Sequence, residues 1–256
     1  MVKVMVLRAA GSNCDLETQF AFQSVGSQAD LVHINKLSAH DVKLSDYQIL
    51  AIPGGFTYGD DISAGKVLAN QLKYQLADVL QEFVDRKKLV IGICNGFQVL
   101  MKAGLLPVVN FQGRQDVTLT FNDSGKFEDR WVYLNVNHSN CVFTRDIKEK
   151  VYFPVAHAEG KFVPRNSSVI DQLKQNRQVV FQYAAPKGEK VGYPYNPNGS
   201  VENIAGICDP SGRVMGLMPH PERHIDRTNH PRWTRRVNED EPDGIPIFRN
   251  AVNYFK

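Results

Sequence analysis

Short apolar runs alternate with amphipathic stretches over the first two-thirds of the chain. The runs at 2–8, 48–52 and 89–93 have the length and continuity of strands that are buried on both faces. From 67 to 88 apolar residues recur with a period near 3.6, which predicts an amphipathic helix. Strands that alternate with helices in this way indicate a parallel sheet with crossover helices.

Another helix is expected directly after the first strand. Ser12 and Asp15 have the spacing of a capping pair at its start. Leu16 and Phe20, four residues apart, are expected to share its apolar face.

The pattern changes between about 115 and 183, where strict alternation predicts antiparallel strands added beside the parallel core. The further elements expected are strands at 117–121, 131–137, 203–209 and 214–218, and helices at 168–176 and 244–255. Together they predict an α/β fold, a three-layer sandwich of the flavodoxin-like kind with a mostly parallel central sheet. With no repeat, low-complexity tract or obvious linker, a single domain over 1–256 is expected.

Composition narrows the function classes. A net charge of +3 with both signs mixed gives no nucleic-acid footprint. No apolar run approaches the ~20 residues of a membrane helix, and the first residues lack a secretory cleavage site. The four cysteines lie far apart without a C-x-x-C pair, which favours neither a disulfide framework nor a zinc ribbon. We therefore expect a cytoplasmic protein that binds neither nucleic acid nor membrane.

Cys94 differs from the other three cysteines, which are expected to be small buried side chains. It lies between Gly92 and Gly96, where a strand gives way to a helix, which is the pattern of a nucleophile elbow with cysteine in place of serine. Such a turn is expected to expose the side chain, and the N-terminus of the following helix favours the thiolate. The alternative is a core cysteine beside tightly packed glycines.

A thiolate nucleophile needs a base and a group that orients it. His220 follows the strand-like run 214–218 and precedes a proline, which favours an extended backbone and places Glu222 on the same side. The predicted order is nucleophile Cys94, base His220 and carboxylate Glu222. A metal site with His220, Glu222, His224 and His230 is a weaker alternative, because the spacing is not H-E-x-x-H.

Pro53-Gly54-Gly55 ends the strand at 48–52. A phosphate loop is excluded in the following stretch because Gly59 and Gly65 are five residues apart and Val67 replaces the Ser or Thr that holds magnesium. We expect Gly54 and Gly55 to supply a backbone N–H to an oxyanion hole, paired with the N–H of Asn95. A plain turn is the alternative.

The segment 223–243 carries five arginines followed by an acidic run. It is expected to be a solvated loop, with a partner contact as the sharper alternative.

Taken in order, Pro53-Gly54-Gly55, Gly92-Ile-Cys94-Asn-Gly96-Phe-Gln98 and His220-Pro-Glu222 resemble the class I, triad-type glutamine amidotransferases. The stretches "PGGFTYGDDISAGKVLANQLK", "GICNGFQVL", "GSNCD" and "HAEGKF" are similar to the glutaminase subunits of phosphoribosylformylglycinamidine synthases. The resemblance covers about residues 3–224. The stretch after Glu222 departs from the family pattern in being longer and more charged than the family minimum.

The resemblance implies that Cys94 attacks the side-chain amide of glutamine and releases ammonia through a thioester, with His220 and Glu222 as base and orienting group. It places Gln98 beside the glutamine site and gives 157–160 a part in binding substrate. It implies no cofactor in this chain, with ATP and magnesium in a large synthetase subunit, and a small bridging subunit as a further partner. The alternatives are a stand-alone thiol hydrolase of γ-glutamyl substrates and a non-catalytic module with the same fold.

Overall fold

The computed structural model describes residues 1–113, 115–235 and 241–256, and its centre is one mixed sheet of nine strands in the order β2-β1-β3-β4-β11-β10-β9-β6-β7. The strands of this sheet are β1 (Lys3–Arg8), β2 (Gln28–His33), β3 (Ile49–Ile52), β4 (Leu89–Ile93), β6 (Glu128–Val136), β7 (Lys150–His157), β9 (Val179–Ala184), β10 (Ile204–Cys208) and β11 (Val214–Leu217). From β2 to β11 neighbours run parallel, and from β11 to β7 they run antiparallel. The predicted parallel core with added antiparallel strands is confirmed.

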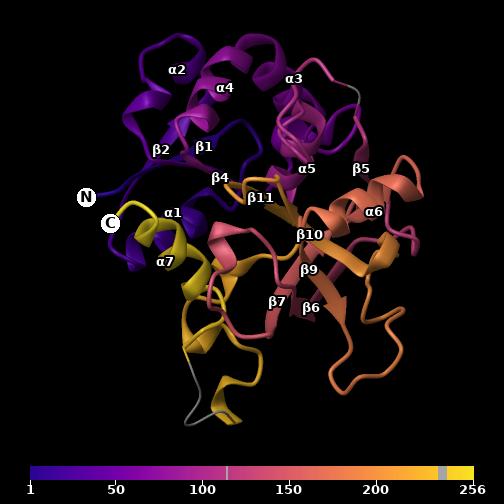
Figure 1. Ribbon diagram of the computed structural model, residues 1–256. Coiled ribbons are helices and arrows are strands. Elements are labelled where there is room, and N and C mark those ends of the chain that lie inside the picture. The colour runs from indigo at the N-terminus through magenta and orange to yellow at the C-terminus, as the bar shows by residue number, and fades with distance from the viewer. Residues whose placement is uncertain (114, 236–240) are drawn as a thin grey trace.

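Helices cover both faces of the parallel strands (Figure 1). The helices of the described residues are α1 (Asp15–Ser24), α2 (Ile34–Ser38), α3 (Lys66–Gln75), α4 (Ala77–Asp85), α5 (Asn95–Ala103), α6 (Ser167–Gln175) and α7 (Ile245–Asn253). In Figure 1, α1 and α7 lie on one side of the strands, while α3, α4 and α5 lie on the other. Phe22 of α1 meets Phe248 of α7 edge to face, with ring centroids 5.0 Å apart, which joins these two helices.

Three local expectations were wrong. The stretch 67–88 forms two helices, because Leu76 leaves helical geometry (φ −128°, ψ 11°) and separates α3 from α4. Strand β5 (Val117–Thr120) pairs with β8 (Lys161–Pro164) in a separate two-stranded sheet and does not join the main one.

Helix α1 is the third exception. Its N-cap is Cys14, without a capping side chain, and Leu16 and Phe20 are 65% and 60% exposed. The helix instead turns Asp15 inward, where the carboxylate lies 3.0 Å from Nε of Arg8 in β1. Periodicity alone could not show which side of this short helix faces the sheet.

No helix in the described ranges is long and apolar enough to cross a membrane. All four cysteines are buried and free.

Candidate active site

The carboxyl ends of the parallel strands lie together at one end of the sheet, and the loops that follow these strands meet there. Cys94 follows β4, and the neighbouring β11, which is parallel to it, leads to His220. Gly54 follows β3, and the loop after β1 leads to Cys14. In open α/β sheets the carboxyl ends of the strands are where sites form.

Cys94 has the predicted elbow geometry, with φ 52° and ψ −106° at the junction of β4 and α5. A methyl group on Gly96 would lie 1.9 Å from the carbonyl oxygen of Ile52, and one on Gly92 would lie 2.6 Å from that of Gly96. Both glycines are therefore required for α5 to pack this closely against β3 and β4. A non-glycine residue at this φ costs about 1–3 kcal/mol, which is the strain expected of a functional turn.

The expectation that the elbow exposes the sulfur was wrong, because Cys94 is only 5% exposed. The end of β7 and the turn after it cover the residue. Its Sγ lies 3.7 Å from the carbonyl oxygen of Ala156, and Nε2 of Gln98 donates to the carbonyl oxygen of Glu159 at 2.5 Å. The segment 157–160 is thereby held over the start of α5.

His220 and Glu222 form the predicted pair, with Nδ1 of the imidazole 2.6 Å from Oε1 of the carboxylate. His220 is extended as expected (φ −104°, ψ 91°), whereas Glu222 lies in the short 3₁₀ turn Pro221–Arg223 and not in an extended segment. Each residue is only 2% exposed. Nε2 of His220 and Oε2 of Glu222 are buried and have no hydrogen-bond partner among the described residues.

Opposing influences set the pKa of His220. Burial lowers it, but the negative charges of Glu222 and Cys94 and the nearby sulfurs of Cys14 and Cys94 outweigh burial, so that the pKa is raised well above its usual value. The imidazolium is thus stabilised beside the elbow. Nε2 is the ring nitrogen left to exchange a proton with a reacting group.

Gly54 and Gly55 lie where the oxyanion hole was expected. A methyl group on Gly54 would lie 2.8 Å from Cε1 of His220 and 3.5 Å from Cβ of Cys94, so its backbone touches both residues. Gly55 has φ 147° and packs against the 11–13 loop, which a side chain would obstruct. Within the described residues, the backbone N–H groups of Gly55 and Asn95 donate to no protein acceptor. They remain available to a developing negative charge.

The side chain of Asn95 fixes the loop after Gly55 to the start of α5. Its Oδ1 accepts from the Thr57 hydroxyl at 2.7 Å, and its Nδ2 donates to Asp60 at 3.1 Å and to Oε1 of Gln98 at 2.9 Å. Gln98 is fully engaged between Asn95 and Glu159. In this structure Gln98 therefore positions the loops that enclose the site.

Cys14 lies in the site. The sequence pattern pointed to it only as part of the motif "GSNCD" and did not predict this position. Its thiol donates to Oδ1 of Asn13 at 3.1 Å, and Nη2 of Arg223 donates to its sulfur at 3.1 Å. Burial raises the pKa of the Cys14 thiol, although His220 and Arg223 oppose this rise. Cys14 is therefore kept as a neutral thiol, unlike a nucleophile.

His157 lies beside the pair and is neutral. Burial, and then the charge of His220, lower the pKa of His157 to about 3. Its Nδ1 lies 3.1 Å from Oδ1 of Asn122, which also accepts from the N–H of Gly160 at 3.1 Å. This network shapes the segment 157–160, which follows the Ala156 carbonyl beside Cys94.

The four residues of the alternative metal site, His220, Glu222, His224 and His230, are not brought together in the structure. Among the described residues, the group with metal-ligand spacing is Cys14, His220 and Glu222, with ligand atoms within 4.8 Å of one another. His224 and His230 lie apart from it, against the ring of Trp131 at centroid distances of 5.2 Å and 5.7 Å. The group coincides with the proposed base and its orienting carboxylate.

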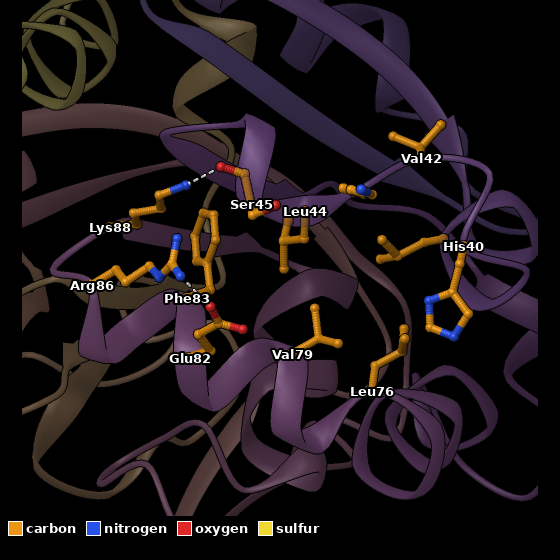
Figure 2. A pocket seen from close by; sticks show the side chains of 12 residues that line it. His40, Val42, Leu44, Ser45, Leu76, Val79, Glu82, Phe83, Arg86 and Lys88 are labelled. Carbon is orange, nitrogen blue, oxygen red and sulfur yellow. Dashed lines mark hydrogen bonds and ion pairs between the residues drawn. The ribbon is translucent and has the colours of Figure 1, made fainter.

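A separate small cavity of about 140 Å³ lies between α4 and the segment from Leu37 to Ser45 (Figure 2). Leu44, Val79 and Phe83 line it, and Nζ of Lys88 donates to the carbonyl oxygen of Ser45 at its rim. The cavity lies at the amino ends of β3 and β4, whereas Cys94 lies at the carboxyl end of β4. It contains none of the predicted site residues.

The segment 223–243 is described up to 235 and again from 241, so part of this prediction lies outside the described residues. Arg223 bonds Glu17 of α1 and Cys14, and is thus part of the site wall. Arg227–Asn229 and Trp233–Arg235 are short 3₁₀ turns.

The elbow cysteine and the buried histidine–carboxylate pair lie together at the carboxyl ends of the parallel strands. The family model described as "CobB/CobQ-like glutamine amidotransferase domain" matches residues 1–255. The chain belongs to this glutamine amidotransferase family, as the resemblance predicted.

Similar proteins narrow the family further. The chain is 48% identical to the phosphoribosylformylglycinamidine synthase subunit PurQ of Dehalococcoides mccartyi, over 99% of this chain and 97% of that one. It is 44% identical to the PurQ subunit of Methanococcus maripaludis, with the same coverage of 99% and 97%.

Solved structures agree with this placement. A chain in the structure of PurLQS from Thermotoga maritima has a TM-score of 0.76 and 33% identity, covering 100% of this chain and 99% of that one. The glutaminase domain of Trypanosoma brucei CTPS, with bound acivicin, has a TM-score of 0.58 at 12% identity, covering 98% of this chain and 92% of that one. The latter likeness concerns the fold alone.

Proposed function

We propose that this chain is the glutaminase subunit of a phosphoribosylformylglycinamidine synthase, with Cys94, His220 and Glu222 as its catalytic residues. The observation that carries the catalytic assignment is the buried His220–Glu222 pair, 2.6 Å apart, next to a cysteine held in elbow geometry. The named relatives, which match along nearly the whole chain, support the choice of this synthase.

In the first half of the reaction, the Cys94 thiolate attacks the side-chain carbonyl carbon of glutamine. The carbon–sulfur bond forms and the carbonyl oxygen becomes an oxyanion, which receives the backbone N–H groups of Gly55 and Asn95. The intermediate then collapses, the carbon–nitrogen bond breaks, and the His220 imidazolium gives its proton to the departing nitrogen. The products are ammonia and a γ-glutamyl thioester.

In the second half, neutral His220 takes a proton from a water molecule that attacks the thioester. The carbon–sulfur bond breaks, glutamate leaves, and the thiolate and imidazolium are restored. Glu222 holds Nδ1 of the imidazole throughout, which leaves Nε2 to carry the proton in both halves.

Glutamine must reach a sulfur that is nearly covered. The carbonyl oxygen of Ala156 lies 3.7 Å from it, and Gln98 holds the adjoining segment 157–160 through the carbonyl oxygen of Glu159. We assign Gly54, Gly55, Asn95 and Gln98 to the walls of the glutamine site, and 157–160 to its cover. Entry requires this cover to move, and its return separates the site from bulk solvent, with the hydrolytic water enclosed beside the thioester.

The remaining chemistry belongs to other chains. Formation of an amidine from formylglycinamide ribonucleotide consumes ATP, and we place ATP and magnesium in a large synthetase subunit and no cofactor in this chain. A small bridging subunit completes the assembly, in the cytoplasm. Because ammonia in neutral water is mostly ammonium, which has no lone pair, it has to pass to the acceptor site without meeting solvent. The whole chain 1–256 acts as one amidotransferase domain.

The test is to assay glutamine hydrolysis by the chain alone and with the synthetase subunits of the same organism, formylglycinamide ribonucleotide and ATP. Low activity alone and a rise on addition are expected. Equal turnover in both conditions would contradict the proposal. Faster cleavage of γ-glutamyl peptides than of glutamine would favour a stand-alone thiol hydrolase instead.

A further inference from the structure

A basic groove with an aromatic floor lies on the antiparallel side of the sheet, outside the catalytic residues. Its volume is about 660 Å³, and its lining includes Arg130, Lys187, Arg232 and Arg235. None of its lining residues is acidic among those described. We call this feature the basic groove.

Aromatic side chains form the floor. Trp131 of β6 and Tyr152 of β7 pack with ring centroids 5.1 Å apart, and Tyr133 lies 4.4 Å from Tyr152. Trp233, beside the rim, is 41% exposed. Tryptophan, tyrosine and arginine are the residues most enriched in the energetic centres of protein interfaces.

The cations of the rim differ in how far they are neutralised. Arg130 pairs with the buried Glu128 and lies over the ring of Tyr193. Arg232 and Arg235 are exposed, and no acidic side chain in the described ranges pairs with either of them. The groove therefore presents positive charge that an acidic surface can complement.

Strand β7 joins the groove to the catalytic residues. It is the edge strand of the sheet, and the carbonyl oxygens of alternate residues point away from β6. Three of these carbonyl oxygens face partners outside the sheet: that of Tyr152 lies 2.9 Å from Nδ1 of His224, and that of Pro154 accepts from the N–H of His220 at 2.9 Å. That of Ala156 accepts from Sγ of Cys94 at 3.7 Å. A displacement along β7 thus acts on His220 and Cys94 together.

We propose that the basic groove is the docking site for an acidic protein surface of the synthetase assembly, and that docking raises glutaminase activity by repositioning β7. This inference rests on the proposed function, since it assigns a place to the partner. A protein is favoured over a phosphate compound because Arg232 and Arg235 stand on an exposed rim. In addition, no α-helix of the described residues begins in the lining, so no helix N-terminus there offers its backbone N–H groups to a phosphate.

The test uses the double variant Arg232→Glu/Arg235→Glu in the whole chain. Its matched control is Lys36→Glu/Lys43→Glu, which makes the same charge change at exposed positions near the opposite edge of the sheet. Affinity for the purified synthetase subunits is measured at low and high salt, and glutamine hydrolysis is measured with and without them. Arg232→Lys/Arg235→Lys serves as the charge-preserving rescue.

We expect the charge-reversed variant to bind at least tenfold more weakly at low salt and to lose most of its salt dependence. Its hydrolysis without partner should stay within twofold of wild type, and its activation should return only at higher partner concentration. The control and the lysine variant should behave as wild type. Binding should also slow hydrogen exchange in 150–157.

Two contrary outcomes are distinguishable. If the charge-reversed variant binds and is activated like wild type, or if ATP or inorganic phosphate alone saturates the groove and activates the enzyme, the docking inference is overturned and the proposed function stands. If the wild-type chain is neither bound nor activated by the subunits, both fail.

Discussion

One imidazole carries the proton in both halves of the proposed reaction, so its charge state governs the site. Burial alone would keep His220 neutral, and the opposing attraction comes mainly from Glu222. A raised pKa in the folded protein adds stability that is fully present below the unfolded value of about 6.5 and fades as the pH rises through the folded pKa. The same carboxylate therefore affects catalysis and stability.

Replacing Glu222 with glutamine should lower kcat by about 10²–10⁴-fold, because the imidazole loses its orienting carboxylate. Burial then dominates, the pKa of His220 falls, and the alkaline limb of the kcat/KM profile moves to lower pH. Glu82→Gln removes an equal charge from an exposed i,i+4 pair with Arg86 and should leave the profile unchanged. An unshifted alkaline limb in Glu222→Gln would contradict the assigned role.

The two thiols of the site should differ in reactivity. A glutamine-mimicking electrophile is expected to modify Cys94 and to spare Cys14. Burial raises the pKa of the Cys14 thiol, and this thiol is already hydrogen-bonded to Asn13 and Arg223. Peptide mass mapping after modification gives the answer directly. Cys14→Ser should not reduce the modification of Cys94, and preferential labelling of Cys14 would refute the assignment.

Strand ends and the turns after them could be read from the sequence. The glycines around Cys94 and the proline after His220 restrict the backbone locally, so their effect does not depend on distant residues. The side of α1 that faces the sheet, the break at Leu76 and the pairing of β5 could not be predicted this way. Each of these is decided by contacts with other elements, such as Asp15 with Arg8.

The tight seating of α5 against β3 yields a stability prediction. Gly96→Ala would place a methyl group 1.9 Å from the Ile52 carbonyl oxygen, so α5 must shift, at a cost of about 1–3 kcal/mol. For a chain of this size each kcal/mol lowers Tm by roughly 2–4 °C. Gly192→Ala is the control, because a methyl group there meets nothing within 4 Å. Equal Tm values for the two variants would contradict the close packing of the elbow.

At the scale of the whole molecule, the candidate active site is assembled from segments far apart in the chain. Cys94 and the Ala156 that covers it are 62 residues apart, and Arg223 and Cys14 are 209 apart. Local sequence patterns therefore predicted the elbow, the contact of His220 with Glu222 and the family, but not the cover over the sulfur, the place of Cys14 or the link through β7. These features depend on the antiparallel strands closing over the end of the parallel core.

The most direct test of the account is to trap the thioester. The chain is mixed with radiolabelled glutamine in the presence of its synthetase subunits, quenched in acid during turnover, and digested to locate the label. We predict label on the peptide that contains Cys94 and none in Cys94→Ser. Ammonia release at the wild-type rate without label on that peptide, or undiminished activity of Cys94→Ser, would contradict it.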